Sequence, residues 1–160
     1  MKWVTPVALG IVVALAAPAQ AVRQVDARTM TIRLISTDTG STVLTERPPT
    51  GQASKGDLIV VSAKLRNAAR QFGRPRGAVV GNASYVFTFR SQTVADVIVE
   101  STLFGGRLRA AGLARLNTGR HTFTVTGGRG TFANAHGTAG FRPLPCHCER
   151  QLLIYRLRLP

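Results

Sequence analysis

The sequence predicts an all-β fold, an eight-stranded antiparallel β-barrel, and two observations carry this prediction. No segment keeps a 3.6-residue apolar period for more than about two turns, so no amphipathic helix is indicated. Short alternating segments instead recur along the chain, separated by turns that contain glycine. About eight such strands can close into a small barrel with room for one ligand, and closure leaves no strand edge exposed.

The first half of the chain is expected to form three strands. Apolar and polar residues alternate in residues 29–36, and the turn-forming residues 38–41 are expected to end this strand. Prolines and a glycine mark residues 46–54 as a loop. Residues 57–66 and 78–90 are predicted strands, because each keeps its apolar side chains on one face.

The second half is expected to add strands at residues 93–104, 107–116, 120–126, 138–142 and 151–159. Gly105-Gly106 favours a hairpin turn, and residues 117–119 turn the chain again. Residues 126–137 contain four glycines. Since glycine adopts positive φ and allows close backbone approach, Gly127, Gly128 and Gly130 are expected to form a tight connection between two strands.

The composition bounds the domain and its partners. A chain of 160 residues with 44% hydrophobic residues is long enough for one domain with a core. Its 21 lysines and arginines against 7 acidic residues give a formal charge of +14. This charge fits either a polyanion-binding face or a strongly charged surface. The arginines are spread along the chain and aromatic residues are few, so no specific nucleic-acid partner is predicted.

The amino terminus has the pattern of a secretory signal peptide. Lys2 precedes an apolar run at residues 7–17, and Ala19-Gln20-Ala21 is a small-x-small cleavage site. The apolar run is shorter than the roughly 20 residues that a membrane span needs, and no later segment could span. We therefore expect a signal peptide at residues 1–21, a single domain at residues 22–160 and a secreted, extracellular protein without a membrane span.

The glycine-rich segment carries a family resemblance. Residues 126–132, Thr-Gly-Gly-Arg-Gly-Thr-Phe, followed by Ala-His-Gly at 135–137, resemble the Thr-Gly-Gly-x-Gly-x-Phe-x-x-Ala-x-Gly signature of dirigent proteins and allene oxide cyclases. Residues 56–60, Gly-Asp-Leu-Ile-Val, resemble the segment that opens one of their barrel strands, and residues 77–81 resemble their glycine-containing strand. Order and spacing agree from about Thr29 to the carboxyl end.

The resemblance implies a calycin-like, eight-stranded antiparallel barrel with a hydrophobic cavity and no cofactor, here in a secreted bacterial protein. It implies a small hydrophobic ligand or reactive intermediate, a homo-oligomer (dimer or trimer), and a cofactor-free cyclase, isomerase or dirigent-type stereochemical guide. Thr131 and His136 stand where dirigent proteins carry an aspartate and an arginine. The acidic residue that the cyclases carry early in their first strand has no match in residues 29–36. The resemblance therefore implies the fold and leaves the chemistry open.

Two other functions use the same sequence features. The first is a non-catalytic protein that binds a ligand in the cavity without turnover. The second is a polyanion-binding surface protein, whose candidate residues are Arg107, Arg109, Arg115, Arg156 and Arg158. Whether the barrel is an enzyme is thus left open by the sequence.

Three residues are the candidate catalytic groups: Tyr85, Tyr155 and His136. The two tyrosines lie in register with apolar residues on faces expected to point inward, and His136 is chosen by its position in the motif. Phenol and imidazole groups donate protons or orient a ligand oxygen. The alternative is that the tyrosines are core residues with bonded hydroxyls and that His136 is an ordinary loop histidine.

Four residues are the candidate ligand-binding groups: Phe87, Phe89, His121 and Phe123. Phe87 and Phe89 share the face of Tyr85, and His121 alternates with Phe123 and Val125. The alternative for His121 is a half-exposed position at the rim, next to the turn at residues 117–120.

Cys146-His147-Cys148 is a further cluster. In an exported chain two cysteines indicate a disulfide, although a bridge across one intervening residue is strained. A strained disulfide or free thiols rank first, an intermolecular bridge second and a metal site last. Since no fourth ligand is evident nearby, no metal site is predicted.

Overall fold

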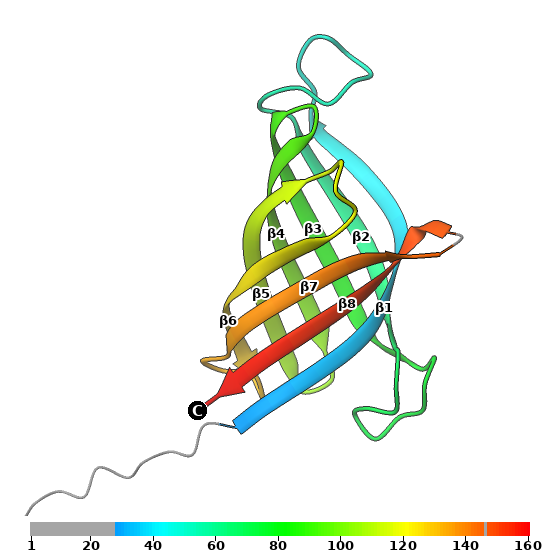
Figure 1. Cartoon of the computed structure of the whole chain (residues 1–160), viewed down its shortest axis with the longest axis vertical. Coiled ribbons are helices and arrows are strands. Elements are labelled where there is room, and N and C mark those ends of the chain that lie inside the picture. Colours follow the sequence, from blue (N-terminus) through cyan, green and yellow to red (C-terminus); the bar gives the residue numbers. More distant parts are fainter. Residues whose placement is uncertain (1–27, 146) are drawn as a thin grey trace, which may run out of the picture.

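The predicted barrel is confirmed. A computed structural model describes residues 28–145 and 147–160, except for the side chains of His147 and Cys148. These residues form eight antiparallel strands that close into one barrel in the order β1 to β8 (Figure 1). The strands are β1 (Arg28–Thr45), β2 (Leu58–Asn67), β3 (Val79–Ser91), β4 (Val94–Leu103), β5 (Gly106–Arg115), β6 (His121–Gly130), β7 (His136–Leu144) and β8 (His147–Leu159).

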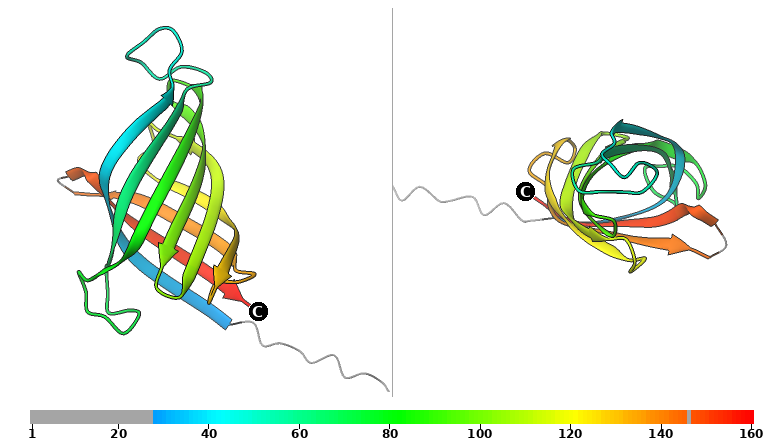
Figure 2. Two further views of the ribbon diagram at one scale, coloured as in Figure 1. Left: turned by 180° about the vertical axis from the view of Figure 1, so that it is seen from behind. Right: turned by 90° about the horizontal axis from the view of Figure 1, so that it is seen from above.

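The topology is a simple up-and-down meander. Each strand pairs with its neighbours in sequence, and β1 pairs with β8 from Arg28↔Leu159 to Thr37↔Arg150, which closes the barrel. Seen from above, the strands surround the interior (Figure 2). The β1–β2, β3–β4 and β5–β6 connections lie at one end, the loop end. The β2–β3, β4–β5 and β6–β7 connections lie at the other, the terminal end, where β8 finishes beside the start of β1 (Figure 1).

The expected turn at residues 38–41 is wrong. These residues continue β1, and their pairing with β2 shifts register between Asp38 and Gly40. The turn-forming residues are absorbed as a β-bulge because β2 continues past them as a pairing partner. Cross-strand pairing thus overrides the local turn preference.

The glycines of the 126–137 segment lie mostly inside a strand. Gly127, Gly128 and Gly130 belong to β6, and the turn to β7 is formed by residues 131–135. A Cβ on Gly128 would lie 2.2 Å from the Phe132 carbonyl oxygen, and one on Gly130 would lie 2.3 Å from that of Gly105. The expected connection is therefore displaced by a few residues, and these two glycines serve close backbone approach.

The core lies in the interior of the barrel and takes in side chains from all eight strands. Because side chains alternate between the two faces of each strand, every strand contributes inward residues at a spacing of two. Fully buried side chains include Ile32, Leu65, Leu108 and Leu153. Phe132, from the β6–β7 turn, joins the same core cluster. The terminal half thus holds mainly apolar side chains, and the buried polar residues Ser101 and Asn67 lie among them.

Two sequence predictions involve residues outside the described part of the chain. The signal peptide at residues 1–21 and Cys146 lie outside the described residues, so export and the Cys146–Cys148 disulfide stay predictions. In the described part of the chain, no helix is long and apolar enough to cross a membrane.

Candidate functional site

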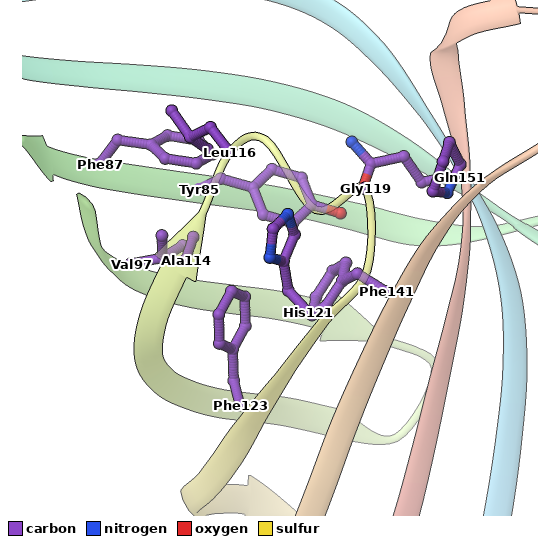
Figure 3. A pocket seen from close by; sticks show the side chains of 11 residues that line it. Tyr85, Phe87, Val97, Ala114, Leu116, Gly119, His121, Phe123, Phe141 and Gln151 are labelled. Carbon is purple, nitrogen blue, oxygen red and sulfur yellow. The ribbon is translucent and has the colours of Figure 1, made fainter. Parts of the chain in front are cut away.

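A half-open pocket of about 170 Å³ lies inside the barrel toward the loop end. Four of the predicted residues line it together: Tyr85, Phe87, His121 and Phe123. Phe141, Leu116 and Gln151 complete most of the wall (Figure 3). The pocket is therefore an aromatic cavity with a few polar groups, which is the usual composition of a small-molecule site.

The aromatic walls hold one another in place. Tyr85 meets Phe141 edge to face, with ring centroids 5.8 Å apart and an interplanar angle of 77°. The ring centroids of Phe141 and Phe123 are 5.1 Å apart. The ring of His121 stacks on that of Phe123, with centroids 6.2 Å apart and an interplanar angle of 3°. These contacts join β3, β6 and β7, so the shape of the pocket depends on rings from three strands.

Tyr85 is the polar group deepest in this wall. Its hydroxyl lies 2.7 Å from the hydroxyl of Ser36 on β1, in a buried hydrogen bond in which either oxygen could be the donor. Burial is the main cause that raises the pKa of the Tyr85 phenol well above its usual range. The phenol is therefore neutral at physiological pH, and it can donate a hydrogen bond but cannot act as a phenolate base.

His121 and Gln151 supply the other polar ends. Both are half-buried, and Figure 3 shows them directed toward the side of the pocket where the Tyr85 hydroxyl lies. Burial lowers the pKa of the His121 imidazole, which keeps the ring neutral near pH 7. A neutral imidazole has one donor and one acceptor nitrogen, so it could accept a proton from a ligand or orient its oxygen.

Asp38 stands beside this group at the β1 bulge. Its half-buried carboxyl comes two residues after Ser36, on the same side of the strand. Burial, and then the charge of Glu149, raises the pKa of the Asp38 carboxyl. The negative charge of Asp38 in turn helps to raise the pKa of Tyr85.

Three predicted site residues do not line the pocket. Phe89 is buried next to Phe87, with ring centroids 6.4 Å apart. Tyr155 is fully buried toward the terminal end, 2.7 Å from the Ser101 hydroxyl, and burial raises its pKa to about 12. His136 is exposed at the start of β7, where it pairs with Arg158 and faces outward. The structure thus separates the proposed catalytic trio, and Tyr85 alone faces the pocket.

The sequence interpretation missed seven of the eleven residues that line the pocket, and Gln151 and Phe141 are two of these seven. Gln151 is in phase with the inward residues Leu153 and Tyr155, so the alternation of β8 contained the signal. Phe141 is in phase with buried Ala139 in β7. In the described residues, no group of three or more His, Cys, Asp or Glu side chains is placed to hold a metal ion.

The barrel is similar to several solved structures, all under 25% identical in sequence. No protein-family model and no curated protein sequence matches the chain. Among solved structures, a pyocyanin demethylase matches with a TM-score of 0.63 and 18% identity, over 80% of this chain and 99% of its own. The pterocarpan synthase dirigent protein GePTS1 matches with a TM-score of 0.61 and 17% identity, over 85% and 86%. The exo-specific intermolecular Diels–Alderase AbnU matches with a TM-score of 0.62 and 12% identity, over 82% and 99%. The chain therefore has the barrel fold of dirigent proteins, as the resemblance of residues 126–137 implied, and the Diels–Alderase has the same fold.

Proposed function

We propose that the protein binds a small, mostly apolar molecule in the barrel pocket, with an oxygen of the ligand directed at Tyr85, His121 and Gln151. The observation that carries this proposal is the pocket itself, in which aromatic walls surround one small group of polar ends. An apolar cavity of about 150 Å³ is large enough for benzene. A pocket of about 170 Å³ therefore holds one ring, and the rest of a larger ligand emerges through its open mouth.

The chemistry that we propose is cofactor-free cyclisation or isomerisation, or stereochemical guidance of a reactive intermediate. Tyr85, a neutral phenol, would donate a hydrogen bond to a ligand oxygen, and neutral His121 would accept or orient a proton. The rigid aromatic walls would select one ligand conformation, which accelerates a reaction by orientation. Neighbours with this fold include a Diels–Alderase and a dirigent protein, and this supports the proposal by analogy of fold alone.

The binding proposal is tested with two neutral aromatic probes, 1-naphthol and naphthalene, by NMR titration of the full barrel. The expected result is saturable binding of both probes with shifts at the pocket residues. Tyr85→Phe should weaken 1-naphthol about tenfold, the loss expected for one buried hydrogen bond, and leave naphthalene unchanged. Tyr155→Phe is the matched control, because it also removes a phenol bonded to serine but does not line the pocket. Equal effects of the two variants on 1-naphthol would reject the site.

Turnover, oligomeric state and export are tested on the protein isolated from its source. Native mass spectrometry would give the mass of the assembly and of any co-purified molecule, and the expected mature chain begins at Val22. Cyclisation or isomerisation leaves the mass of a ligand unchanged. A bound molecule that changes its chromatographic retention but not its mass on incubation would therefore indicate catalysis, and an unaltered molecule would indicate binding alone.

A further inference from the structure

A second hollow lies on the outer face of the barrel, between β5 and β6 near the terminal end. Its volume is about 270 Å³, and three exposed arginines line it: Arg107, Arg109 and Arg129. Leu108, between the first two, is buried in the core, so the arginines point outward. We call this feature the outer arginine hollow. It shares no lining residue with the barrel pocket.

A β-bulge shapes the floor of the outer arginine hollow. Arg109 pairs with Gly127 and the next residue of β5 pairs with Val125, so Thr126 is the extra residue. A Cβ on Gly127 would meet no atom within 4 Å, which shows that the space above this residue is open. The neighbouring Gly128 admits no side chain, because a Cβ there would lie 2.2 Å from a carbonyl oxygen. The floor is thus formed by the main chain of the two glycines, and the three arginines, Glu100 and Thr126 line the sides.

The charges in the hollow are unbalanced. Arg107 and Arg129 occupy directly opposed positions on β5 and β6, an arrangement of like charges that destabilises a sheet. Glu100 supplies one carboxylate, 3.8 Å from Arg109 Nε. Elsewhere in the described chain, the only other ion pair joins Arg90 and Asp96. An anion between Arg107 and Arg129 would remove the repulsion that the protein alone leaves uncompensated.

We propose that the outer arginine hollow binds a tetrahedral oxyanion, and specifically a phosphate group. Guanidinium groups present forked N–H donors that match phosphate oxygens in paired hydrogen bonds. The volume is several times the roughly 30 Å³ that one water molecule occupies in the liquid, so a partly hydrated phosphate fits. The phosphate is free in solution or belongs to a lipid headgroup, and the experiment separates these two sources.

Inorganic phosphate is titrated into the full chain at low ionic strength, and binding is followed through the arginine Nε–Hε signals by NMR. Arg107→Gln and Arg129→Gln should each weaken phosphate binding about tenfold, the loss expected for charge-assisted hydrogen bonds. The matched control is Arg115→Gln. Arg115 is exposed on the same strand about 26 Å from Arg107 at the strand rise, too far to contact the same phosphate. At that distance a single charge acts only weakly through water, so the loss of Arg115 should change the affinity less than about twofold.

A second arm uses vesicles that contain phosphatidylglycerol. Vesicle binding that falls in the Arg129→Gln variant assigns the site to a lipid headgroup, and phosphate binding without such vesicle binding assigns it to a soluble phosphate. Two results would overturn the proposal. One is the absence of saturable phosphate binding at low salt, and the other is an equal loss of affinity in the Arg115→Gln control.

Discussion

Tyr85 and Tyr155 have the same local chemistry in opposite surroundings. Each phenol lies 2.7 Å from a serine hydroxyl, Ser36 in one case and Ser101 in the other. Tyr85 faces the pocket of the loop half, whereas Tyr155 is 0% exposed among the apolar side chains of the terminal half. The difference teaches that an inward tyrosine becomes a site residue or a core residue according to its depth along the barrel.

The largest expected difference between the two tyrosines is in stability. Tyr155→Ala should lower the free energy of unfolding by about 3–5 kcal/mol, because it opens a cavity in a filled part of the core. Tyr85→Ala should cost less, since it enlarges a pocket that is already half open. Chemical denaturation of both variants measures the two losses. Equal losses of unfolding free energy in the two variants would contradict the difference between the two tyrosines.

A smaller effect is expected when only the hydroxyl is removed from the core tyrosine. Tyr155→Phe leaves the buried Ser101 hydroxyl without its side-chain partner and should cost about 1–3 kcal/mol of stability. Tyr85→Phe should be milder, because water that enters the pocket can replace the lost partner. The denaturation midpoint of each variant against the unaltered protein checks this order, and a larger loss for Tyr85→Phe would contradict it.

The smallest expected effect is a pH dependence confined to the pocket. The pKa of His121 is lowered by burial, so the unfolded chain takes up its proton more readily than the folded one. The contribution of neutral His121 to folding stability is therefore complete above the ordinary histidine pKa of about 6.5, and it declines as the pH falls below that value. The affinity for 1-naphthol should fall over the same pH range, because the protonated, charged imidazole of His121 then lies in an apolar pocket.

His121→Asn should abolish this pH dependence of probe binding. His136→Asn is the control, because His136 is exposed on the outer face and should leave the dependence unchanged. Titrations at several pH values between about 5 and 8 measure both variants. A pH profile that persists without His121 would assign the effect to another group.

The sequence predicted the pocket only where strand alternation was uninterrupted. Tyr85 with Phe87, and His121 with Phe123, are two residues apart on strands that begin near their expected positions, so their shared inward face follows from the local period. Gln151 was missed because β8 begins at His147, four residues before the expected start, so Gln151 stood at the very start of the expected strand. Pro143, which lies in β7, and Pro145, which lies between β7 and β8, hid this extension of the strands.

Other features depend on partners that no local pattern reveals. The bulge at Asp38 and Gly40 exists because β2 continues to pair with β1, and Gly128 is required because the Phe132 carbonyl approaches it. His136 was chosen by motif position, which specifies no face of the sheet. Because Ala139 points inward, strand alternation places residue 137 inside the barrel and His136 outside. The outward position of His136 could therefore be predicted from the alternation.

The closure of β8 on β1 gives the chain a particular order of assembly. Seven of the eight pairings join strands that follow one another in sequence, and only β1–β8 brings the two ends of the described chain together. Hairpins can therefore form as the chain emerges, but the sheet has two unpaired edges, on β1 and β7, until the last strand arrives. A chain that ends before β8 would present both edges to its neighbours, so completeness of the carboxyl terminus protects the protein from aggregation.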